Sequence, residues 1–326
     1  METREVKRLG RGVSAVGLGC WQLGADWGEV GEDDALAVLR TAAEEGVTFF
    51  DTADVYGDGR SEQLVGRFRA EHDGDVFVAT KMGRRVEQVP ENYTAANFAA
   101  WTDRSRRNLG MDTLDLVQLH CPPTPVYSSD AVFDALDDLV EKGRIARYGV
   151  SVETCEEALT ALARPNVASV QIILNCLRLK PLERVLPAAA EAGAAIIVRV
   201  PLASGLLSGK YTKDTTFAAD DHRNFNRHGE AFDVGETFAG VPFEAGLEAV
   251  DRLRAVVPEG RTLAQFALRW ILDQPGVTTV IPGARNPDQA RANTEAAALP
   301  TVDGDAAATV RAVYDELIRP LVHDRW

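Results

Sequence analysis

The sequence predicts a single (β/α)8 TIM barrel over residues 1–326, and three observations support this fold class. Short apolar runs rich in β-branched residues alternate with amphipathic stretches, as buried parallel strands alternate with helices that cover them. Eight such pairs follow one another, which is enough to close a barrel. The length of 326 residues suits one barrel with insertions. An open doubly wound sheet is the alternative.

The elements follow in a regular order after an N-terminal β-hairpin. In the first predicted helix, Ala35, Leu39 and Ala42 share one face, and Gly46 follows its end. We predict strands at residues 16–20, 47–50, 76–80, 114–119, 145–150, 167–173, 195–200 and 277–281. We predict helices at residues 33–45, 61–69, 95–109, 131–142, 156–163, 182–192, 243–256, 262–273 and 287–297.

Residues 203–240 form the one long connection without clear periodicity, and they follow the seventh predicted strand. The segment carries five glycines, Gly205, Gly209, Gly229, Gly235 and Gly240. Loops of this length are usually functional or disordered. We find no second domain and no internal repeat beyond the strand–helix unit.

The composition narrows the class of protein. The formal net charge is −14 with no block of consecutive basic residues, which argues against nucleic acid and anionic membrane surfaces as partners. Four cysteines are scattered without a C-x-x-C pair, as is typical of reduced thiols. The N-terminus lacks an apolar signal segment, and no run reaches transmembrane length. We therefore expect a cytoplasmic protein.

Polar residues gather at the ends of the predicted strands, where barrels place their active sites. Taken alone, each of these residues could have a purely structural role, such as a helix cap for an aspartate or a core position for a histidine. A ring of ionisable groups at one barrel mouth favours catalysis. The residues are Asp51, Lys81, His120 and Ser151 after their strands, Gln171 within the sixth, Arg199 near the end of the seventh, and Tyr56 in the loop after Asp51.

Several motifs resemble those of the aldo-keto reductase family, in the family's order, from about residue 9 to about residue 298. Residues 50–57 read FDTADVYG and are followed by Ser61 and Glu62; residues 79–81 read ATK, and residues 115–120 read DLVQLH. Residues 199–210 read RVPLASGLLSGK and resemble the cofactor loop, and residues 281–293 resemble the adenosine-binding segment. The resemblance implies an NADPH-dependent reductase of aldehydes or ketones, similar to a bacterial branch of the family.

Elementary chemistry supports a catalytic role for four of these side chains. Reduction of a carbonyl needs a proton donor, and an unperturbed tyrosine has a pKa of about 10. A nearby Lys81 ammonium would make the proton of Tyr56 easier to release. Asp51 would pair with Lys81, and His120 would donate to the carbonyl oxygen where negative charge develops. None of these roles needs a metal, and we expect none.

The sequence has neither of the two standard phosphate-binding motifs, the G-x-G-x-x-G fingerprint and the P-loop. The residues from Gly17 begin a G-x-G-x-x-G pattern, but Gln22 breaks it. The resemblance instead implies that Ser151 and Gln171 bind the nicotinamide carboxamide. It also implies that the pyrophosphate and adenosine are held by Pro201, Leu202, Ser204, Gly205, Leu207, Lys210, Gly283, Arg285, Gln289 and Asn293. Arg285 suits a 2′-phosphate, because a guanidinium pairs with phosphate in a fork geometry, and this favours NADPH over NADH.

Two positions depart from the common family pattern. Val152 stands where many relatives have asparagine, so one amide contact to nicotinamide is missing. Arg199 stands where many place an aromatic ring, and its planar guanidinium can stack on nicotinamide in that place.

The substrate contacts are expected at the same mouth. We predict that Trp21, Val55, Arg223 and Phe225 contact the substrate. Trp326 either caps the site or packs on the barrel wall.

Two alternative functions remain open beside that of a reductase. Potassium-channel β subunits resemble this family, so a cofactor-binding regulatory subunit is the alternative function. A metal-dependent barrel hydrolase is the other, but the five histidines form no H-x-H or H-E-x-x-H pattern. Turnover of NADPH with small aldehydes separates the first rival from the reductase, and metal analysis tests the second.

Overall fold

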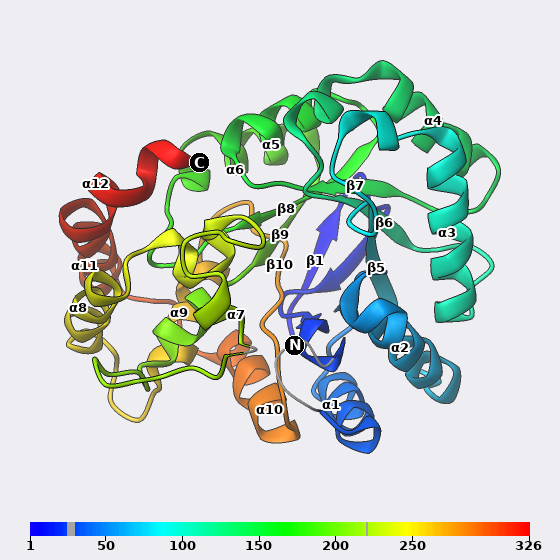
Figure 1. Ribbon diagram of the computed structural model, residues 1–326. Helices are drawn as coiled ribbons and strands as arrows, with labels where there is room; N and C mark the ends of the chain where they lie inside the picture. The colour runs from blue at the N-terminus through cyan, green and yellow to red at the C-terminus, as the bar shows by residue number, and fades with distance from the viewer. Residues whose placement is uncertain (25–29, 220) are drawn as a thin grey trace.

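The main sheet of the computed structural model, which describes residues 1–24, 30–219 and 221–326, is an eight-stranded parallel barrel (Figure 1). Neighbouring strands pair in chain order from β3 to β10. Bridges from Val16 to Val280 and from Gly19 to Gly283 then join the first strand to the last. The strands are β3 (Leu18–Gly19), β4 (Phe49–Asp51), β5 (Phe77–Met82), β6 (Leu116–His120), β7 (Tyr148–Ser151), β8 (Val167–Ile173), β9 (Ala195–Arg199) and β10 (Thr279–Val280). The predicted fold class is confirmed.

Helices surround this barrel on its outer side (Figure 1). Thr154 and Thr262 each accept a hydrogen bond in a capping box, which satisfies main-chain N–H groups at the helix start. No helix within the described ranges has both the length and the apolarity needed to cross a bilayer. The helices are α1 (Glu32–Glu44), α2 (Arg60–Glu71), α3 (Ala95–Leu109), α4 (Asp130–Glu141), α5 (Cys155–Leu162), α6 (Pro181–Ala192), α7 (His222–Phe225), α8 (Phe243–Arg254), α9 (Leu263–Leu272), α10 (Pro287–Glu295), α11 (Gly304–Val313) and α12 (Arg319–Val322).

The predicted N-terminal hairpin is present as β1 (Thr3–Val6) and β2 (Arg11–Ser14), paired antiparallel. Its apolar side chains form one buried cluster with residues at the beginnings of the barrel strands, among them Phe49 and Phe77. The hairpin therefore closes the N-terminal end of the barrel. The opposite end, where the strands finish, is left for the site.

The strand boundaries differ slightly from the predicted ones. Asp51, His120 and Ser151 are the last residues of their strands, and Lys81 is the last but one of β5, so none of the four follows its strand. The apolar pattern reports burial, whereas main-chain pairing continues through the polar residue that ends each strand. The first and last strands have only two residues each, because isolated bridges make the closure there.

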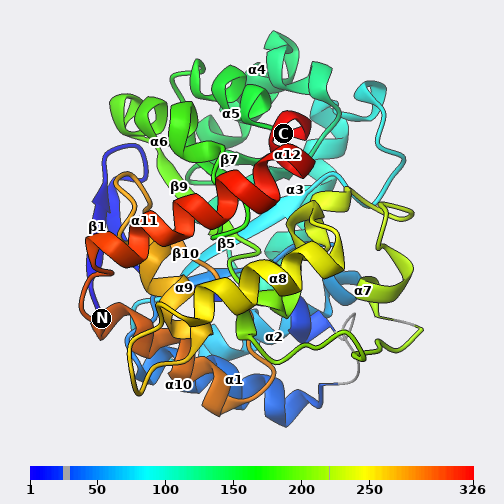
Figure 2. The same cartoon turned by 90° about the vertical axis from the view of Figure 1, so that its left-hand side faces the viewer.

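The C-terminal region holds elements that the sequence analysis did not assign. After residue 297 the chain forms α11, a π-helical turn at Tyr314–Ile318 and α12. Figure 2 shows α11 lying beside α8 on one side of the barrel, and the two helices contact each other. The long connection at residues 203–240 is also more structured than predicted, since it contains α7 and several 3-10 turns.

Candidate active site

Three adjacent strands place three of the four predicted catalytic side chains at the same end of the barrel. Asp51 ends β4, Lys81 lies near the end of β5, and His120 ends β6. Tyr56 begins a 3-10 turn in the loop after β4. Gly57 follows at φ 56°, where a Cβ would lie 2.2 Å from the carbonyl oxygen of Gly24. Only glycine allows this approach, which holds the Tyr56 loop against the 3-10 turn at Trp21–Gly24.

Lys81 connects the members of this group. Its Nζ donates to Asp51 Oδ1, to the carbonyl oxygen of Thr52 at 2.9 Å and to the Tyr56 hydroxyl at 3.3 Å. Asp51 Oδ2 accepts from Gln171 Nε2 at 2.7 Å and from Gln118 Nε2 at 3.4 Å. Asp51 and Lys81 are buried, whereas Tyr56 is partly exposed and can meet a ligand.

Burial and the ion pair act in opposite directions on these groups. Burial raises the pKa of Asp51 more than Lys81 and the two amides lower it, so the net shift is upward. Burial alone would lower the pKa of Lys81, but Asp51 and Tyr56 outweigh it and the net shift is upward. Lys81 therefore stays an ammonium ion. Burial also raises the pKa of Tyr56, against the lowering effect of Lys81. The expected net lowering is thus not found here, although Lys81 acts in the predicted direction.

His120 lies beside Tyr56, with the two ring centroids 5.8 Å apart and the planes nearly perpendicular. Its main-chain oxygen accepts from Arg84 Nε at 3.1 Å. Burial, with the nearby cations Arg84, Lys81 and Arg199, holds the pKa of His120 well below its usual value. The imidazole is therefore neutral at physiological pH and can donate one hydrogen bond without carrying charge.

The predicted nicotinamide contacts lie on the next strands. Ser151 ends β7, and its hydroxyl oxygen accepts from Cys121 Sγ at 3.3 Å. Gln171 in β8 directs its amide nitrogen to Asp51, so it lies beside the predicted catalytic residues. The register pairs Ser151 with Gln171, which brings the two side chains to neighbouring places.

Arg199 is the centre of a buried charged cluster that the sequence analysis missed. Its Nη2 donates to Glu153 Oε2 at 2.8 Å and to the carbonyl oxygen of Val152 at 2.9 Å, and its Nη1 lies 2.6 Å from Glu236 Oε1. Arg84 adds a second guanidinium, 3.1 Å from Glu153 Oε1. The sequence could have indicated Glu153 as a site residue, because it follows Ser151 by two residues. It could not have indicated Glu236, because the loop that carries Glu236 has no periodicity.

The carboxyl groups of this cluster respond differently to their surroundings. Although burial acts to raise it, Arg199 and Arg84 lower the net pKa of Glu153. Burial raises the pKa of Glu236 more than Arg199 lowers it. Cys121 joins both carboxylates within 4.8 Å, a group that could ligate a metal. Because Arg199 and Arg84 already match the two negative charges, the arrangement favours an ion-pair cluster.

The predicted pyrophosphate loop folds as a 3-10 segment at Ala203–Ser208 with positive φ at three non-glycine positions, Val200, Ala203 and Ser204. Ser204 Oγ donates to the carbonyl oxygen of Glu236 at 2.8 Å and accepts from the main-chain nitrogen of Phe238 at 3.1 Å. These bonds join the loop to the segment that carries Glu236. Pro201, Leu202, Gly205 and Leu207 lie within or directly before the loop, and Lys210 follows it, exposed.

The predicted adenosine segment lies between β10 and α10. Arg285 is exposed, and its main-chain nitrogen donates to Gln289 Oε1 at 2.9 Å. Asn293 Nδ2 donates to the carbonyl oxygen of Gly283 at 3.2 Å. The structure thus brings these four predicted residues together at one edge of the mouth.

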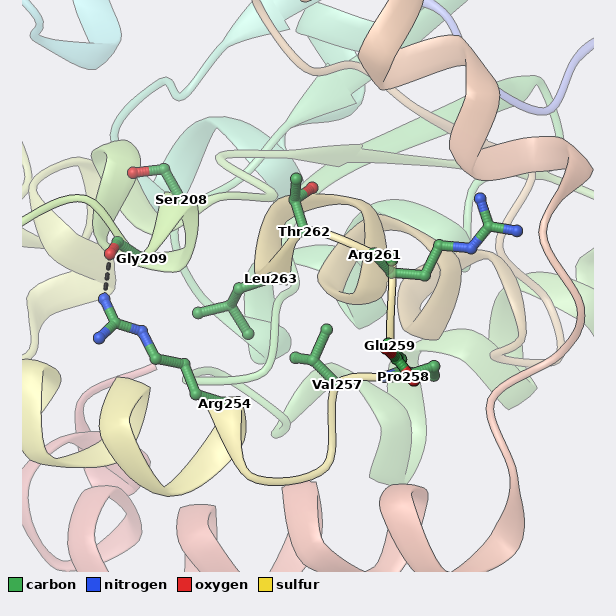
Figure 3. Close-up of a pocket in the computed structure, with 10 residues that line it drawn as sticks. Ser208, Gly209, Arg254, Val257, Pro258, Glu259, Arg261, Thr262 and Leu263 are labelled. Atoms are coloured by element: carbon green, nitrogen blue, oxygen red, sulfur yellow. Dashed lines mark hydrogen bonds between the residues drawn. The ribbon is translucent and has the colours of Figure 1, made fainter.

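A cavity of about 400 Å³ borders the end of the pyrophosphate loop and not the group around Tyr56 (Figure 3). Ser208 and Gly209 line it from the loop. The cavity is also lined by Arg254, the last residue of α8, and by residues 257–263, which lead into the start of α9. The sequence analysis did not predict these residues. Arg254 donates to the carbonyl oxygen of Gly209 across its edge (Figure 3).

The predicted substrate residues separate into two groups. Trp21 stacks on Tyr56, with centroids 5.9 Å apart, and Val55 directly precedes Tyr56. Among the described residues, Arg223 and Phe225 contact other side chains of the long connection. Arg223 pairs with Asp221, donates to Tyr211 and lies 4.7 Å over the Phe217 ring. Phe225 is 42% exposed and has its edge toward Phe232.

Two aromatic residues that were not predicted lie against Trp21 instead. The centroid of His222 is 5.5 Å from Trp21, and that of Phe232 is 6.1 Å away. Burial lowers the pKa of His222 to about 4, so this side chain is uncharged at neutral pH. Both residues lie in the long connection, where the sequence offers no periodicity to mark which side chains turn inward.

Comparison with known proteins agrees with this geometry. The model of the aldo/keto reductase family matches residues 15–315. Aldo-keto reductase YhdN of Bacillus subtilis is 31% identical over 302 residues, which are 90% of this chain and 88% of that protein. Aldo-keto reductase yakc [NADP(+)] of Schizosaccharomyces pombe is 29% identical over 286 residues, 84% of this chain and 80% of that protein. The solved glycerol dehydrogenase AKR11B4 of Gluconobacter oxydans superposes with a TM-score of 0.80 at 29% identity, covering 97% and 96% of the two chains.

Proposed function

This chain belongs to the aldo/keto reductase family, and on that premise we propose that it reduces an aldehyde or ketone with NADPH, using Tyr56 as the proton donor. The observation that carries the proposal is the contact of Lys81 Nζ with both Asp51 and the Tyr56 hydroxyl. A buried ammonium ion at that hydroxyl stabilises the phenolate that remains after proton transfer.

The residues present fit NADPH. Lys210 and Arg285 are exposed cations in the two segments predicted to hold the cofactor's phosphates, and the Arg285 guanidinium suits a 2′-phosphate. One relative's name includes NADP(+), which supports the same choice. When bound, NADPH supplies the hydride. Ser151 and Gln171 would hold the nicotinamide end, and Arg199, its charge matched by Glu153 and Glu236, would lie beside that ring.

Each residue of the catalytic group then has a distinct task. Tyr56 donates its proton to the carbonyl oxygen as that atom gains negative charge. The neutral His120 orients the carbonyl oxygen by a hydrogen bond. Asp51 keeps Lys81 in place, and Gln118 and Gln171 keep Asp51 in place. Trp21 forms the wall on which the substrate packs, beside Val55.

The name of glycerol dehydrogenase AKR11B4 refers to glycerol, a small hydroxylated molecule. We therefore start the search for the substrate with small hydroxyaldehydes and hydroxyketones. Simple aldehydes and sugars complete the panel.

The test combines titration of NADPH and NADH with turnover of this carbonyl panel. We expect tighter binding of NADPH than of NADH, and turnover of at least one small carbonyl. Tyr56→Phe should lower kcat by about 10²–10⁴-fold, the usual contribution of a positioned acid, with the Kd for NADPH unchanged. A Tyr56→Phe enzyme at the parental rate would overturn the assignment of the proton donor. Tight NADPH binding without turnover of any carbonyl would favour the regulatory alternative.

A further inference from the structure

Trp326 occupies a position from which it contacts both sides of the Arg199 cluster. Its ring lies 3.9 Å from the Arg178 guanidinium carbon, and its Nε1 donates to Asp233 Oδ1 at 3.3 Å. Only 6% of the residue is exposed. Trp326 is therefore buried, against the loops that follow β8 and β9.

One contact leads from Trp326 to Glu153. Arg178 is buried in the loop after β8, and its Nη2 donates to the main-chain oxygen of Glu153 at 2.6 Å. Burial, together with the neighbouring Arg199, lowers the pKa of Arg178 to about 10. A desolvated guanidinium over an indole is strongly attracted to it. Trp326 thus holds the side chain that supports Glu153, a partner of Arg199.

The other contact leads from Trp326 to Glu236. Gly240 has φ 74°, and a Cβ there would lie 2.0 Å from the Trp326 ring, so the outer edge of the indole approaches a main chain without a side chain. Asp233, the hydrogen-bond acceptor of Trp326, also accepts from the main-chain nitrogen of Gly235 at 2.7 Å. The 233–240 segment held in this way carries Glu236, the other partner of Arg199.

The same segment fixes the pyrophosphate loop. Ser204 Oγ bonds to the main chain of both Glu236 and Phe238. Ala203, Ser204, Phe238 and Ala239 all have positive φ, a costly conformation for residues other than glycine that persists only where the surroundings impose it. A support for the 233–240 segment is therefore also a support for the loop predicted to wrap the cofactor.

We propose that Trp326 is a positioning residue for cofactor binding, which acts by holding Arg178 and the 233–240 segment around Arg199. The proposal rests on the proposed function only in that the cofactor is NADPH. Its structural part concerns the two joined segments, residues 200–208 and 233–240, and can be measured without any cofactor.

The test compares Trp326→Ala, Trp326→Phe and the control Trp101→Ala. Trp101 is likewise mostly buried, but its ring contacts are with Phe98 of α3 and with Tyr93 just before α3. Hydrogen exchange read by mass spectrometry reports on the two joined segments, and calorimetry gives the Kd for NADPH. Steady-state kinetics separates KM for NADPH from kcat.

We expect Trp326→Ala to speed exchange in residues 200–208 and 233–240 and to raise the Kd for NADPH about tenfold, a change of about 1.4 kcal/mol. Its kcat at saturating NADPH should fall by less than its affinity. Trp326→Phe should recover most of the affinity, since a phenyl ring still covers Arg178. Trp101→Ala should lower the urea midpoint but leave exchange in the two segments and the Kd as in the parent.

Parental exchange rates in both segments of Trp326→Ala would overturn the proposal, whether or not the parent binds NADPH. An equal rise in the Kd for NADPH in Trp101→Ala would also overturn the proposal, because the weaker binding would then reflect general destabilisation. A parent that binds no NADPH contradicts the proposed function instead, and the exchange data still decide whether Trp326 holds the two segments.

Discussion

The two halves of the barrel mouth are built in different ways. On the β4–β6 side, Asp51, Lys81 and His120 come from three consecutive strands whose register brings them together. On the β7–β9 side, Arg199 is surrounded by Glu153 and by Glu236 of the long connection. The first half is fixed by strand pairing. The second depends on segments far apart in the chain, so changes at a distance should disturb it more easily.

The largest effect is expected from Lys81→Met, which tests the half fixed by strand pairing. The change leaves Asp51 buried without its ionic partner, which typically costs about 3–5 kcal/mol of unfolding free energy. Activity should be lost as well. Urea unfolding and kcat give the two readouts. Lys142→Met is the matched control, since Lys142 is exposed in a surface pair with Asp138, and it should change stability by less than about 0.5 kcal/mol. A stable Lys81→Met protein would show that this pair contributes little.

Glu236→Gln tests the half built from distant segments. It replaces one charged partner of Arg199 by a neutral one, while Glu153 still holds Nη2. We expect a loss of about 1–2 kcal/mol of unfolding free energy, less than for Lys81. Weaker binding of NADPH should accompany a smaller change in kcat. Urea unfolding, calorimetry and kinetics measure these quantities, with the exposed Glu244→Gln as control. A large fall in kcat with unchanged affinity would contradict the division of roles between the two halves.

The same difference explains how much the sequence could predict. Strand-end residues such as Asp51 and Lys81 follow visible apolar runs, so the barrel fold, its hairpin and the proximity of the catalytic group were predictable. Glu236, His222 and Phe232 lie in a connection without periodicity, where nothing marks which side chains turn inward. Arg223 was predicted as a substrate contact on residue type alone, and nothing in the sequence indicated its pair with Asp221. Tertiary contacts decide such positions.

Asp54 shows that the half fixed by strand pairing also carries an unfavourable group. Both of its carboxyl oxygens are buried and, among the described residues, have no hydrogen-bond partner. Burial, with the neighbouring Glu62, raises the pKa of Asp54 to about 7. A carboxyl group whose folded pKa is raised contributes stability that is full below its unfolded pKa of about 4 and is lost as pH rises through about 7.

Asp54→Asn should remove this dependence. At about pH 8 the variant should be more stable than the parent, by on the order of 1 kcal/mol, since the amide is still buried without a partner. At about pH 4 the advantage should vanish. Urea midpoints at both pH values provide the measurement, and the exposed Asp73→Asn should show no such trend. An advantage that stays constant with pH would mean that Asp54 does not titrate in this range.

The smallest effect is expected at Phe225, in comparison with Phe232 from the same connection. Phe225 is 42% exposed and lies edge-on to Phe232, whereas Phe232 lies against Trp21 beside Tyr56. Phe225→Ala should therefore change stability by less than about 0.5 kcal/mol and leave the KM for the carbonyl nearly unchanged. Phe232→Ala should raise that KM several-fold, because it removes support from the wall formed by Trp21. If Phe225→Ala raised KM as much as Phe232→Ala, the original nomination of Phe225 as a substrate contact would be right. The connection would then have to fold further over the mouth when substrate binds.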